Sequence, residues 1–470
     1  MQRNHVSRRT ILKTGLGFSL STMIPATSLL AGTNKLDAHL VAKPARVALF
    51  GGQNPSTDVW SYNNLVPGPE MRVRQGERLK FIVENQLDEE TTVHSHGLRM
   101  PHAMDGVPYV TQKPIAPGES FTYEFDVPDA GTYWYHPHSN SAEQIERGLS
   151  GAIIVEERVP IAVDRDMTWV LDDWRLSSQG LILGGFGNHM DAGMAGRMGN
   201  AVTINGEIPK MFEVRAGERL RLRLINTANA RVFGLDFGAH RPRIIAYDGQ
   251  PVEPHEPQNG LVVLGPAMRI DLIIDMDHEP KQSVPIFDRF YPAQAYRLIN
   301  VVYSGGSPIR NSSLTSPINL PANTMPEPDI ERAQHHDVVF TGGMMGRGMM
   351  GGGMRDQMMR NGKMWTINGI AFEGPVMNPL LRLEQGRSHI LTLRNETAWY
   401  HPIHLHGHSF RVIARNGRGT RFREWQDTVL IPPRETADIA FVADNPGDWM
   451  FHCHIAEHLA SGMMGIVRVA

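Results

Sequence analysis

Histidines separated by one residue are the side chains of this 470-residue chain with the clearest capacity for chemistry. The pattern histidine–x–histidine occurs five times, as His94/His96, His136/His138, His404/His406, His406/His408 and His452/His454. Because residues i and i+2 point to the same face of a β-strand, each pair would present two imidazoles side by side. Neutral imidazole is the commonest metal ligand among side chains. The pairs therefore predict metal sites.

The only cysteine of the chain lies inside one of these pairs, in the sequence HCH at 452–454. A single cysteine cannot form an internal disulfide, and on a strand Cys453 would point away from the face that carries His452 and His454. It can then bind one metal while the two histidines bind others. A thiolate, two histidines and a weak thioether are the ligands of a blue-copper site. The predicted set is Cys453 with His401, His458 and Met463, and Cys453 would also carry electrons to the histidine pairs.

Three copies of one strand pattern surround these residues. They are VRQGERLKFIVENQL (73–87), VRAGERLRLRLINTA (214–228) and LEQGRSHILTLRNET (383–397). Each has a glycine turn followed by alternating apolar and polar residues, which is typical of a half-buried strand. We therefore expect an all-β fold of three β-sandwich domains, at 38–157, 158–330 and 331–470, with a linker at about 304–334.

The histidine pairs occupy matching places in the first and third of these repeats. His136/His138 and His452/His454 end the same repeated strand, whereas His94/His96 and His404/His406 follow an earlier one. The middle repeat has no such pair. Contact between the first and third domains would therefore gather eight imidazoles at one interface.

Composition and the first residues bear on partners and location. A net charge of -3, with 41% hydrophobic and 20% charged residues, is that of an ordinary globular protein and gives no reason to expect a nucleic-acid partner. The stretch SRRTILK (7–13) and the weakly apolar residues after it resemble a twin-arginine signal, which predicts a signal peptide at 1–31 and a periplasmic protein. Lys13 and small polar residues make a membrane anchor the poorer alternative, so we expect no stable membrane insertion after cleavage.

Four motifs, HSHG, YWYHPHS, HPIHLHGHSF and HCHIAEHLASGM, resemble the copper motifs of the multicopper oxidases, the family of laccases and bacterial cuprous oxidases. The resemblance spans nearly the whole mature chain and implies three cupredoxin-like domains that hold four coppers. It implies a type 2 copper at His94 and His404 and a type 1 copper at His401, Cys453, His458 and Met463. The type 3 pair would be held by His96, His136, His138, His406, His452 and His454.

The resemblance also implies a reaction, in which four one-electron oxidations of a substrate are coupled to reduction of O2 to water. Asp105 matches a family acid near the type 2 copper and is the predicted proton donor, with a turn aspartate as the alternative. Leu459 stands where many bacterial members have a second acid. Asp427 could orient a copper histidine, and His408 is interpreted as structural.

A methionine-rich segment at 342–364 bears on the substrate, because soft thioethers suit Cu(I). It resembles the methionine-rich insert of bacterial cuprous oxidases, and HMDAGMAGRM (189–198) is a smaller cluster. Those enzymes carry an acid and a methionine before the histidine–proline, where this chain has Glu396 and Trp399. The candidate ligands of a substrate metal are Met344, Met345, Met349, Met350, Met354, Asp356, Met358 and Met359.

Two other functions remain open at this stage. A laccase that oxidises small phenols would use the methionine-rich segment only as a lid. The other alternative is a copper-binding envelope protein without enzymatic activity. The complete ligand set argues against this alternative. We therefore expect an oxidase of Cu(I) or another soft metal ion, with a phenol-oxidising laccase as the alternative.

Overall fold

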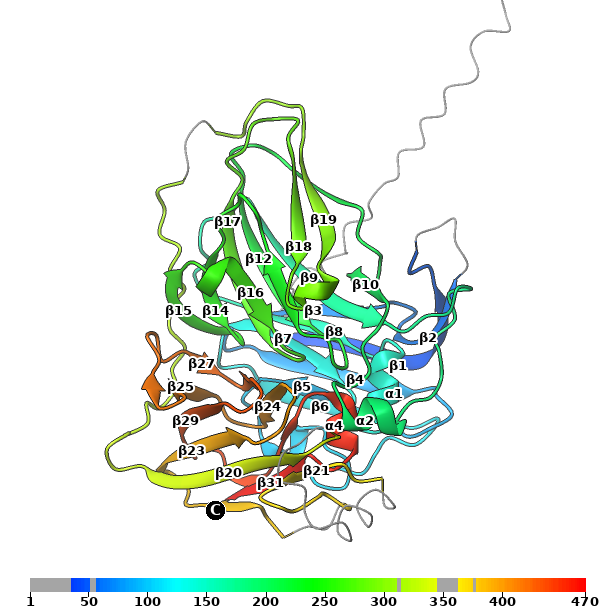
Figure 1. Ribbon diagram of the computed structural model, residues 1–470, viewed down its shortest axis with the longest axis vertical. Coiled ribbons are helices and arrows are strands. Elements are labelled where there is room, and N and C mark those ends of the chain that lie inside the picture. The colour runs from blue at the N-terminus through cyan, green and yellow to red at the C-terminus, as the bar shows by residue number, and fades with distance from the viewer. Residues whose placement is uncertain (1–34, 51–55, 311–313, 345–361, 375–377) are drawn as a thin grey trace, which may run out of the picture. The chain divides into compact units, whose positions relative to one another are not determined.

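The computed structural model describes residues 35–50, 56–310, 314–344, 362–374 and 378–470. Asn34–Ala470 form one packed unit built from six β-sheets (Figure 1). Short helices lie between strands at α1 (Ser141–Glu146), α2 (His189–Gly193) and α4 (Ala456–Ala460). No helix in the described ranges is long and apolar enough to cross a membrane. The predicted all-β fold class is confirmed.

Two sheets form the N-terminal sheet pair, residues 35–156. The first has the order β2-β1-β4-β6, and its strands are β1 (Lys35–Val47), β2 (Thr57–Tyr62), β4 (Arg78–Asn85) and β6 (Ser120–Asp126). The second has the order β3-β8-β7-β5, and its strands are β3 (Gly68–Arg74), β5 (His94–His96), β7 (Gly131–His136) and β8 (Gly151–Glu156). Apolar side chains of both sheets, such as Phe81 and Ile153, share one core, so the pair is a β-sandwich.

The middle sheet pair spans residues 165–303. One sheet has the order β10-β9-β12-β17-β14-β15, with β9 (Arg165–Trp174), β10 (Ala201–Ile204), β12 (Arg219–Asn226), β14 (Arg243–Tyr247), β15 (Gln250–His255) and β17 (Arg269–Asp275). The other has the order β11-β19-β18-β13-β16, with β11 (Met211–Val214), β13 (Phe233–Asp236), β16 (Leu261–Leu264), β18 (Ser283–Asp288) and β19 (Tyr296–Tyr303). Leu222 and Val301 belong to the core between them.

The C-terminal sheet pair spans residues 334–469. One sheet has the order β21-β20-β23-β29-β25-β26, with β27 beside β25; its strands are β20 (Gln334–Gly342), β21 (Trp365–Ile367), β23 (Ser388–Asn395), β25 (Phe410–Arg415), β26 (Arg418–Gly419), β27 (Trp425–Gln426) and β29 (Thr436–Val442). The other has the order β22-β31-β30-β24-β28, with β22 (Leu381–Leu383), β24 (His401–Leu405), β28 (Thr428–Ile431), β30 (Gly447–Cys453) and β31 (Met464–Val469). Before β20, Asn323 hydrogen-bonds to Ala130 and Gln250, which fastens the predicted linker to the other two sheet pairs.

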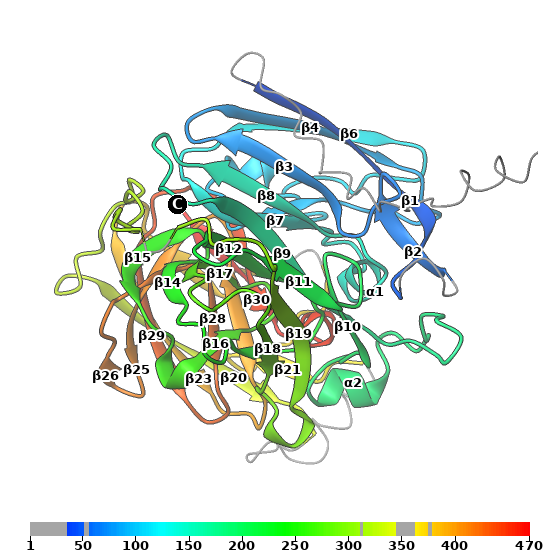
Figure 2. The ribbon, with the colours of Figure 1, turned by 90° about the horizontal axis from the view of Figure 1, so that it is seen from above.

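The three repeated sequences form equivalent strands, β4, β12 and β23, as predicted. Each strand follows a glycine with positive φ, at Gly76, Gly217 and Gly386, where a side chain would strain the turn. The alternation of β4 matches a half-buried strand, but every residue of β12 is buried. The polar side of β12 contacts β7 of the N-terminal sheet pair (Figure 2). Arg223 donates to Thr132 Oγ1 across that contact. Alternating arginines therefore mark an interface here rather than a solvent face.

Candidate metal centre

Two strand pairs of the same kind carry the predicted histidines. In the N-terminal sheet pair, β5 runs antiparallel to β7, with His94 opposite His136. In the C-terminal sheet pair, β24 runs antiparallel to β30, with His404 opposite His452. Each pair of strands thus holds imidazoles on facing positions, because directly opposed residues of an antiparallel pair lie on one face.

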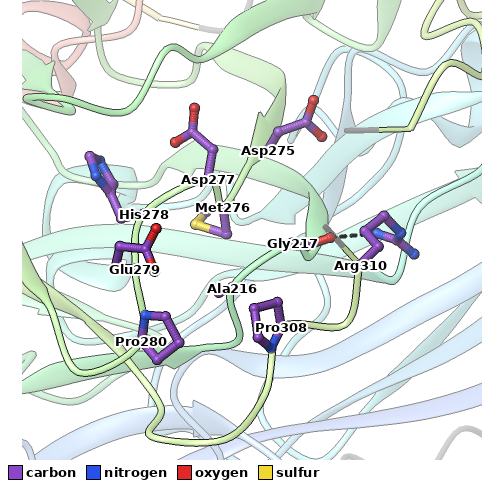
Figure 3. A pocket seen from close by; sticks show the side chains of 10 residues that line it. All are labelled: Ala216, Gly217, Asp275, Met276, Asp277, His278, Glu279, Pro280, Pro308 and Arg310. Atoms are coloured by element: carbon purple, nitrogen blue, oxygen red, sulfur yellow. Dashed lines mark hydrogen bonds between the residues drawn. The ribbon is translucent and has the colours of Figure 1, made fainter. Parts of the chain in front are cut away.

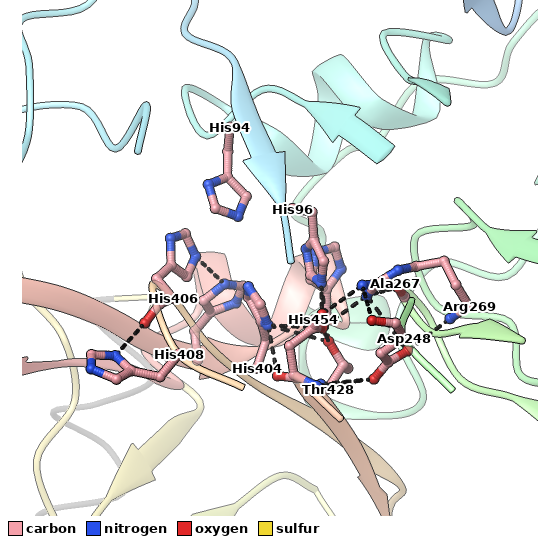
Figure 4. Close-up of polar contacts among 12 residues, drawn as sticks. His94, His96, Asp248, Ala267, Arg269, His404, His406, His408, Thr428 and His454 are labelled. Carbon is pink, nitrogen blue, oxygen red and sulfur yellow. Dashed lines mark hydrogen bonds and ion pairs between the residues drawn. The ribbon is translucent and has the colours of Figure 1, made fainter. Parts of the chain in front are cut away.

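The two strand pairs face one another, and the eight predicted imidazoles meet in a buried histidine cluster. Figure 4 shows His94, His96, His404, His406 and His454 of this cluster. His406 Nε2 lies 3.1 Å from His452 Nε2, and His136 Nε2 lies 3.3 Å from His454 Nε2. The rings of His94 and His406, which come from different sheet pairs, stack at 4.0 Å between centroids. The nitrogens converge in three sets, which are His94/His404/His406, His94/His96/His136 and His138/His406/His452.

Outer hydrogen bonds orient most of these imidazoles. Nδ1 of His94 donates to the carbonyl of Asp105 at 2.7 Å, and Nδ1 of His404 donates to the carbonyl of Asp427 at 2.8 Å. His452 Nδ1 donates to its neighbour's carbonyl at 2.9 Å. In each case the proton is held at Nδ1 and the lone pair of Nε2 is directed into the cluster. Metal-bound histidines show the same outer contacts in proteins generally.

Several ring nitrogens that point into the cluster are free to bind a metal. Nε2 of His94, Nε2 of His404 and both ring nitrogens of His138 are buried and have no hydrogen-bond partner among the described residues. Burial, with repulsion between neighbouring imidazoles, holds the pKa of seven cluster histidines below the usual value: His96, His136, His138, His404, His406, His452 and His454. Neutral imidazoles with unshared inward lone pairs fit the copper ions that the family motifs imply.

Cys453 belongs to a second group, the thiol site, formed with His401 and His458. The thiol Sγ lies 3.5 Å from His401 Nδ1 and 3.7 Å from His458 Nδ1, and the two Nδ1 atoms are 3.2 Å apart. Met463 is buried in the same apolar core, and its carbonyl accepts from the Cys453 backbone N–H at 3.1 Å. Burial raises the pKa of the Cys453 thiol, so the proton must leave when a metal binds.

The side chains of β30 divide between these two sites. Cys453 Sγ faces His401 and His458, whereas His452 and His454 on either side of it join the histidine cluster. The structure therefore places the thiol and the imidazoles on opposite faces of one strand, as the period of a β-strand requires.

The two predicted acids lie in the outer ring of the cluster. The Asp105 carboxylate accepts from His406 Nδ1 at 2.9 Å and lies 3.2 Å from His94 Nδ1. The Asp427 carboxylate accepts from His96 Nε2 at 3.1 Å, which is the orienting contact suggested for it. His408 lies outside the cluster: its Nδ1 donates to the carbonyl of His406 at 3.3 Å, and burial lowers its pKa to about 4.

Several residues of the two sites escaped sequence reasoning. Arg269 of β17 forms a buried ion pair with Asp427, although the middle sheet pair has no metal-binding motif. The ring of Trp365 lies 4.2 Å from the His458 ring between centroids, and its Nε1 donates to the carbonyl of Ala192 at 2.6 Å. The one available signal was the HMDAGMAGRM cluster, because the carbonyl of Met194 accepts from His458 Nε2 at 2.8 Å.

The methionine-rich segment is described only at its ends. Met344 and Met364 lie within the described ranges, whereas Met345, Met349, Met350, Met354, Asp356, Met358 and Met359 lie outside them. A separate surface pocket of about 280 Å³ in the middle sheet pair is lined by Asp277, His278 and Glu279 among others (Figure 3). None of the predicted site residues that the structure describes lines it.

Comparison with protein families covers most of the chain. Three family models, each described as multicopper oxidase, match residues 46–160, 165–289 and 350–470. Multicopper oxidase MmcO of Mycobacterium tuberculosis is 30% identical in sequence, over 98% of this chain and 96% of its own length.

Solved structures give the same result. A multi-copper oxidase from Pseudomonas thermotolerans has a TM-score of 0.82 and 35% identity, covering 93% of this chain and 99% of its own. A multicopper oxidase from Campylobacter jejuni, titled a metallo-oxidase, has a TM-score of 0.78 and 26% identity, covering 94% and 93%. Together with the buried histidine cluster and thiol site, these matches show that the chain belongs to the multicopper oxidases, copper-containing oxidoreductases that use O2 as acceptor and oxidise metal ions or phenols.

Proposed function

We propose that the chain binds four coppers and oxidises Cu(I). His401, Cys453, His458 and Met463 would hold the type 1 copper, and His94 and His404 the type 2 copper. The type 3 pair would be held by His96, His136 and His454 on one side and by His138, His406 and His452 on the other. The support is chemical. Nε2 of both His94 and His404 is buried without a partner among the described residues, and five of the other six histidines approach one another through ring nitrogens. A ring nitrogen of the sixth, His138, lies within 4.8 Å of ring nitrogens of His406 and His452.

Copper in these sites would supply one-electron redox chemistry, by which four electrons from the reductant and four protons convert O2 to two waters. The chain contributes order and insulation. Cys453 is the direct sequence neighbour of His452 and His454, so one residue and one peptide bond join the thiol site to the cluster. Burial of every cluster histidine excludes bulk water from the oxygen-reducing site. Asp105 would hold a proton at His406 Nδ1, and we assign proton supply to it.

The observation that carries the choice of Cu(I) is the covered edge of His458. This imidazole is 0% exposed, and its outward Nε2–H is bonded to the Met194 carbonyl. The segment 189–198 that supplies this carbonyl is fastened from several sides. Arg175 pairs with Asp191 at 2.7 Å, and the Met344 backbone N–H donates to the Gly193 carbonyl at 2.8 Å. A bulky phenol therefore has no direct access to the His458 ring.

The cover over His458 is rich in thioethers. A Cβ on Gly193 would lie 2.9 Å from Met344 Cγ and 3.1 Å from Met364 Cε, so the two described ends of the methionine-rich segment converge beside Met194. Thioethers prefer Cu(I) and offer a phenol little beyond apolar contact. The metallo-oxidase title of the Campylobacter jejuni relative is consistent with a metal-ion substrate.

Deletion of residues 344–359 tests the substrate. It should reduce the rate of Cu(I) oxidation most, and it should leave a bulky phenol unaffected or favour it by opening the route to His458. Steady-state oxidation of Cu(I) and of one phenol is measured at matched copper content. If Cu(I) oxidation is unchanged, a general laccase becomes the better assignment.

A second variant isolates the thioethers from the cover itself. The double substitution Met344→Leu with Met364→Leu keeps apolar volume near Gly193 but removes both sulfur atoms. KM for Cu(I) should rise while the phenol kinetics stay level. Met211→Leu is the matched control, because Met211 is 65% exposed on β11 of the middle sheet pair.

Export to the periplasm is proposed on the first residues alone. Replacing Arg8 and Arg9 by lysine should block export through the twin-arginine route and leave the protein in the cytoplasmic fraction. Normal export of this variant would remove the proposal.

A further inference from the structure

Arg269 brings the middle sheet pair to the histidine cluster. Its guanidinium grips the Asp427 carboxylate with both terminal nitrogens, Nη1 to Oδ1 at 2.8 Å and Nη2 to Oδ2 at 2.5 Å. The remaining N–H groups donate to backbone carbonyls of Thr132 at 3.1 Å, Ala267 at 3.2 Å and Asp248 at 3.1 Å. The side chain is 0% exposed. Figure 4 shows Arg269 beside Ala267 and Asp248. This one side chain therefore joins all three sheet pairs.

Asp427 passes this constraint to His96. Oδ1 of Asp427 accepts from His96 Nε2 at 3.1 Å and from the Thr428 hydroxyl at 2.8 Å, while Thr428 Oγ1 also lies 3.0 Å from His96 Nε2. The opposite nitrogen, His96 Nδ1, lies 3.5 Å from His136 Nε2 inside the cluster. His96 is thus oriented in the reverse sense to His94, His404 and His452, whose Nδ1 atoms point outward.

The local chain is shaped to admit this contact. Gly97, directly after His96, has a φ of 85 degrees, in the left-handed region that favours glycine. A Cβ on Gly97 would collide with Arg269 Nη2 and with Asp427 Oδ2. A side chain at position 97 would therefore displace the arginine, the carboxylate, or both.

The positive charge of Arg269 compensates the buried negative charge of Asp427. Asp427 and Asp248 are both buried, and Arg269 is the cation that contacts them. Removing one partner of a buried ion pair leaves an uncompensated charge, which strongly disfavours the buried arrangement. Without Arg269, Asp427 would lose both contacts that hold its carboxylate against His96.

We propose that Arg269 is a positioning residue of the histidine cluster: it holds Asp427 so that His96 keeps its proton on Nε2 and presents Nδ1 to copper. The inference rests on the proposed copper sites. It assigns the middle sheet pair, which supplies no predicted ligand, a direct part in building the oxygen-reducing centre.

Arg269→Met and Arg269→Lys test this role, with Arg289→Met as control because Arg289 forms an exposed ion pair with Asp236 in the same sheet pair. Copper is titrated into metal-free protein against a chelator, and the thiol site and the histidine cluster are followed separately by visible absorption and by total copper per chain. Arg269→Met should keep the thiol-site absorption and weaken copper binding by the cluster about 10–100-fold, as loss of such outer contacts generally does. Arg269→Lys should fall between Arg269→Met and the native chain.

Histidine 15N spectra of the metal-free protein give a readout independent of activity. They should show the Nε2–H tautomer of His96 in the native chain and its loss in Arg269→Met. If Arg269→Met does not fold, Asp427→Asn addresses the same contact from the carboxylate side and should give the same loss. If folded Arg269→Met binds copper in the cluster as tightly as the native chain, the inference is wrong and the proposed function stands. If the arginine variant does not fold, the same result in Asp427→Asn overturns the inference. Absence of copper from the native cluster would instead overturn the proposed function.

Discussion

The histidine cluster and the thiol site are built by different means, although one strand serves both. The cluster takes histidines from the N-terminal and C-terminal sheet pairs, and an arginine of the middle pair forms an ion pair with its Asp427. The thiol site takes His401, Cys453 and His458 from residues 401–458 and sits in the apolar core of the C-terminal sheet pair, which also contains Met463. One site depends on how the sheet pairs meet, and the other on how a single pair is packed.

This difference separates the kinds of damage to which each site is exposed. Polar outer contacts from Asp105, Asp427 and backbone carbonyls fix the cluster, so loss of a proton donor or acceptor disturbs it. Apolar neighbours such as Trp365 and Phe340 surround the thiol site, so it responds chiefly to a change of ligand or of packing. The predictions below use substitutions that act on one site and spare the other.

Cys453→Ser should have the largest effect. It removes the thiolate and the covalent route to His452 and His454, so the blue absorption should disappear and substrate oxidation should fall to background. The cluster should keep its copper, because its outer contacts are untouched. Visible absorption and copper per chain measure both effects together. A variant that is still blue would show that the thiol site has been assigned wrongly.

Asp105→Asn should have the next largest effect and act on the cluster. Asparagine keeps the size and a hydrogen-bonding oxygen beside His406 Nδ1 but cannot hold and release a proton. With Leu459 unable to substitute as an acid, reoxidation by O2 should slow about 10–100-fold, the usual cost of altering such a contact. Reduction of the thiol site by substrate should stay fast.

Stopped-flow absorption separates these two steps in Asp105→Asn. Asp126→Asn is the control, since Asp126 pairs with Arg78 on the exposed edge of β6. Normal reoxidation of Asp105→Asn would show that water or another group delivers the protons.

Some of this organisation was predictable and some was not, for a physical reason. Histidine spacing, the alternation of HCH and the glycine-led strands are local, so the gathering of the histidines and the all-β fold could be predicted from short stretches of sequence. Arg269 meets Asp427 across 158 residues, and nothing near it marks a metal site. The arginines of β12 alternate as on a solvent-exposed strand, yet they are buried against β7 because the sheet pairs pack together there.

Acid should affect the metal-free cluster more than the metal-free thiol site. The folded-state pKa is below the usual value for seven cluster histidines, but only for His401 and His458 at the thiol site. Below about pH 6.5 the unfolded chain therefore binds more protons than the folded chain, and the free energy of unfolding falls as pH decreases. Each such histidine contributes a slope of roughly 1.4 kcal/mol per pH unit in this range.

Denaturant unfolding of the metal-free protein from pH 7.5 to 5, in steps of about half a pH unit, measures that slope. His136→Gln should reduce it by about one proton without changing its sign. A free energy of unfolding that stays level below pH 6.5 would contradict the neutral state of the cluster.

Met463→Leu should have the smallest effect. An axial thioether bonds weakly and mainly tunes the redox potential, and leucine preserves the apolar packing beside Cys453. The blue absorption should persist, the potential should shift, and turnover should change less than in Asp105→Asn. Redox titration of the visible band measures the shift. An unchanged potential would remove Met463 from the ligand set.

The pairing of β24 with β30 makes the two sites inseparable during folding. Ile403 lies opposite Cys453 and His404 lies opposite His452 in that ladder. A slip of one residue would turn every side chain of β30 to the opposite face. The thiol would then point toward the histidine cluster, and two imidazoles would point into the apolar core of the C-terminal sheet pair. Both centres would be lost at once, with no half-correct form between. The register of this one strand pair therefore determines whether both sites form or neither does.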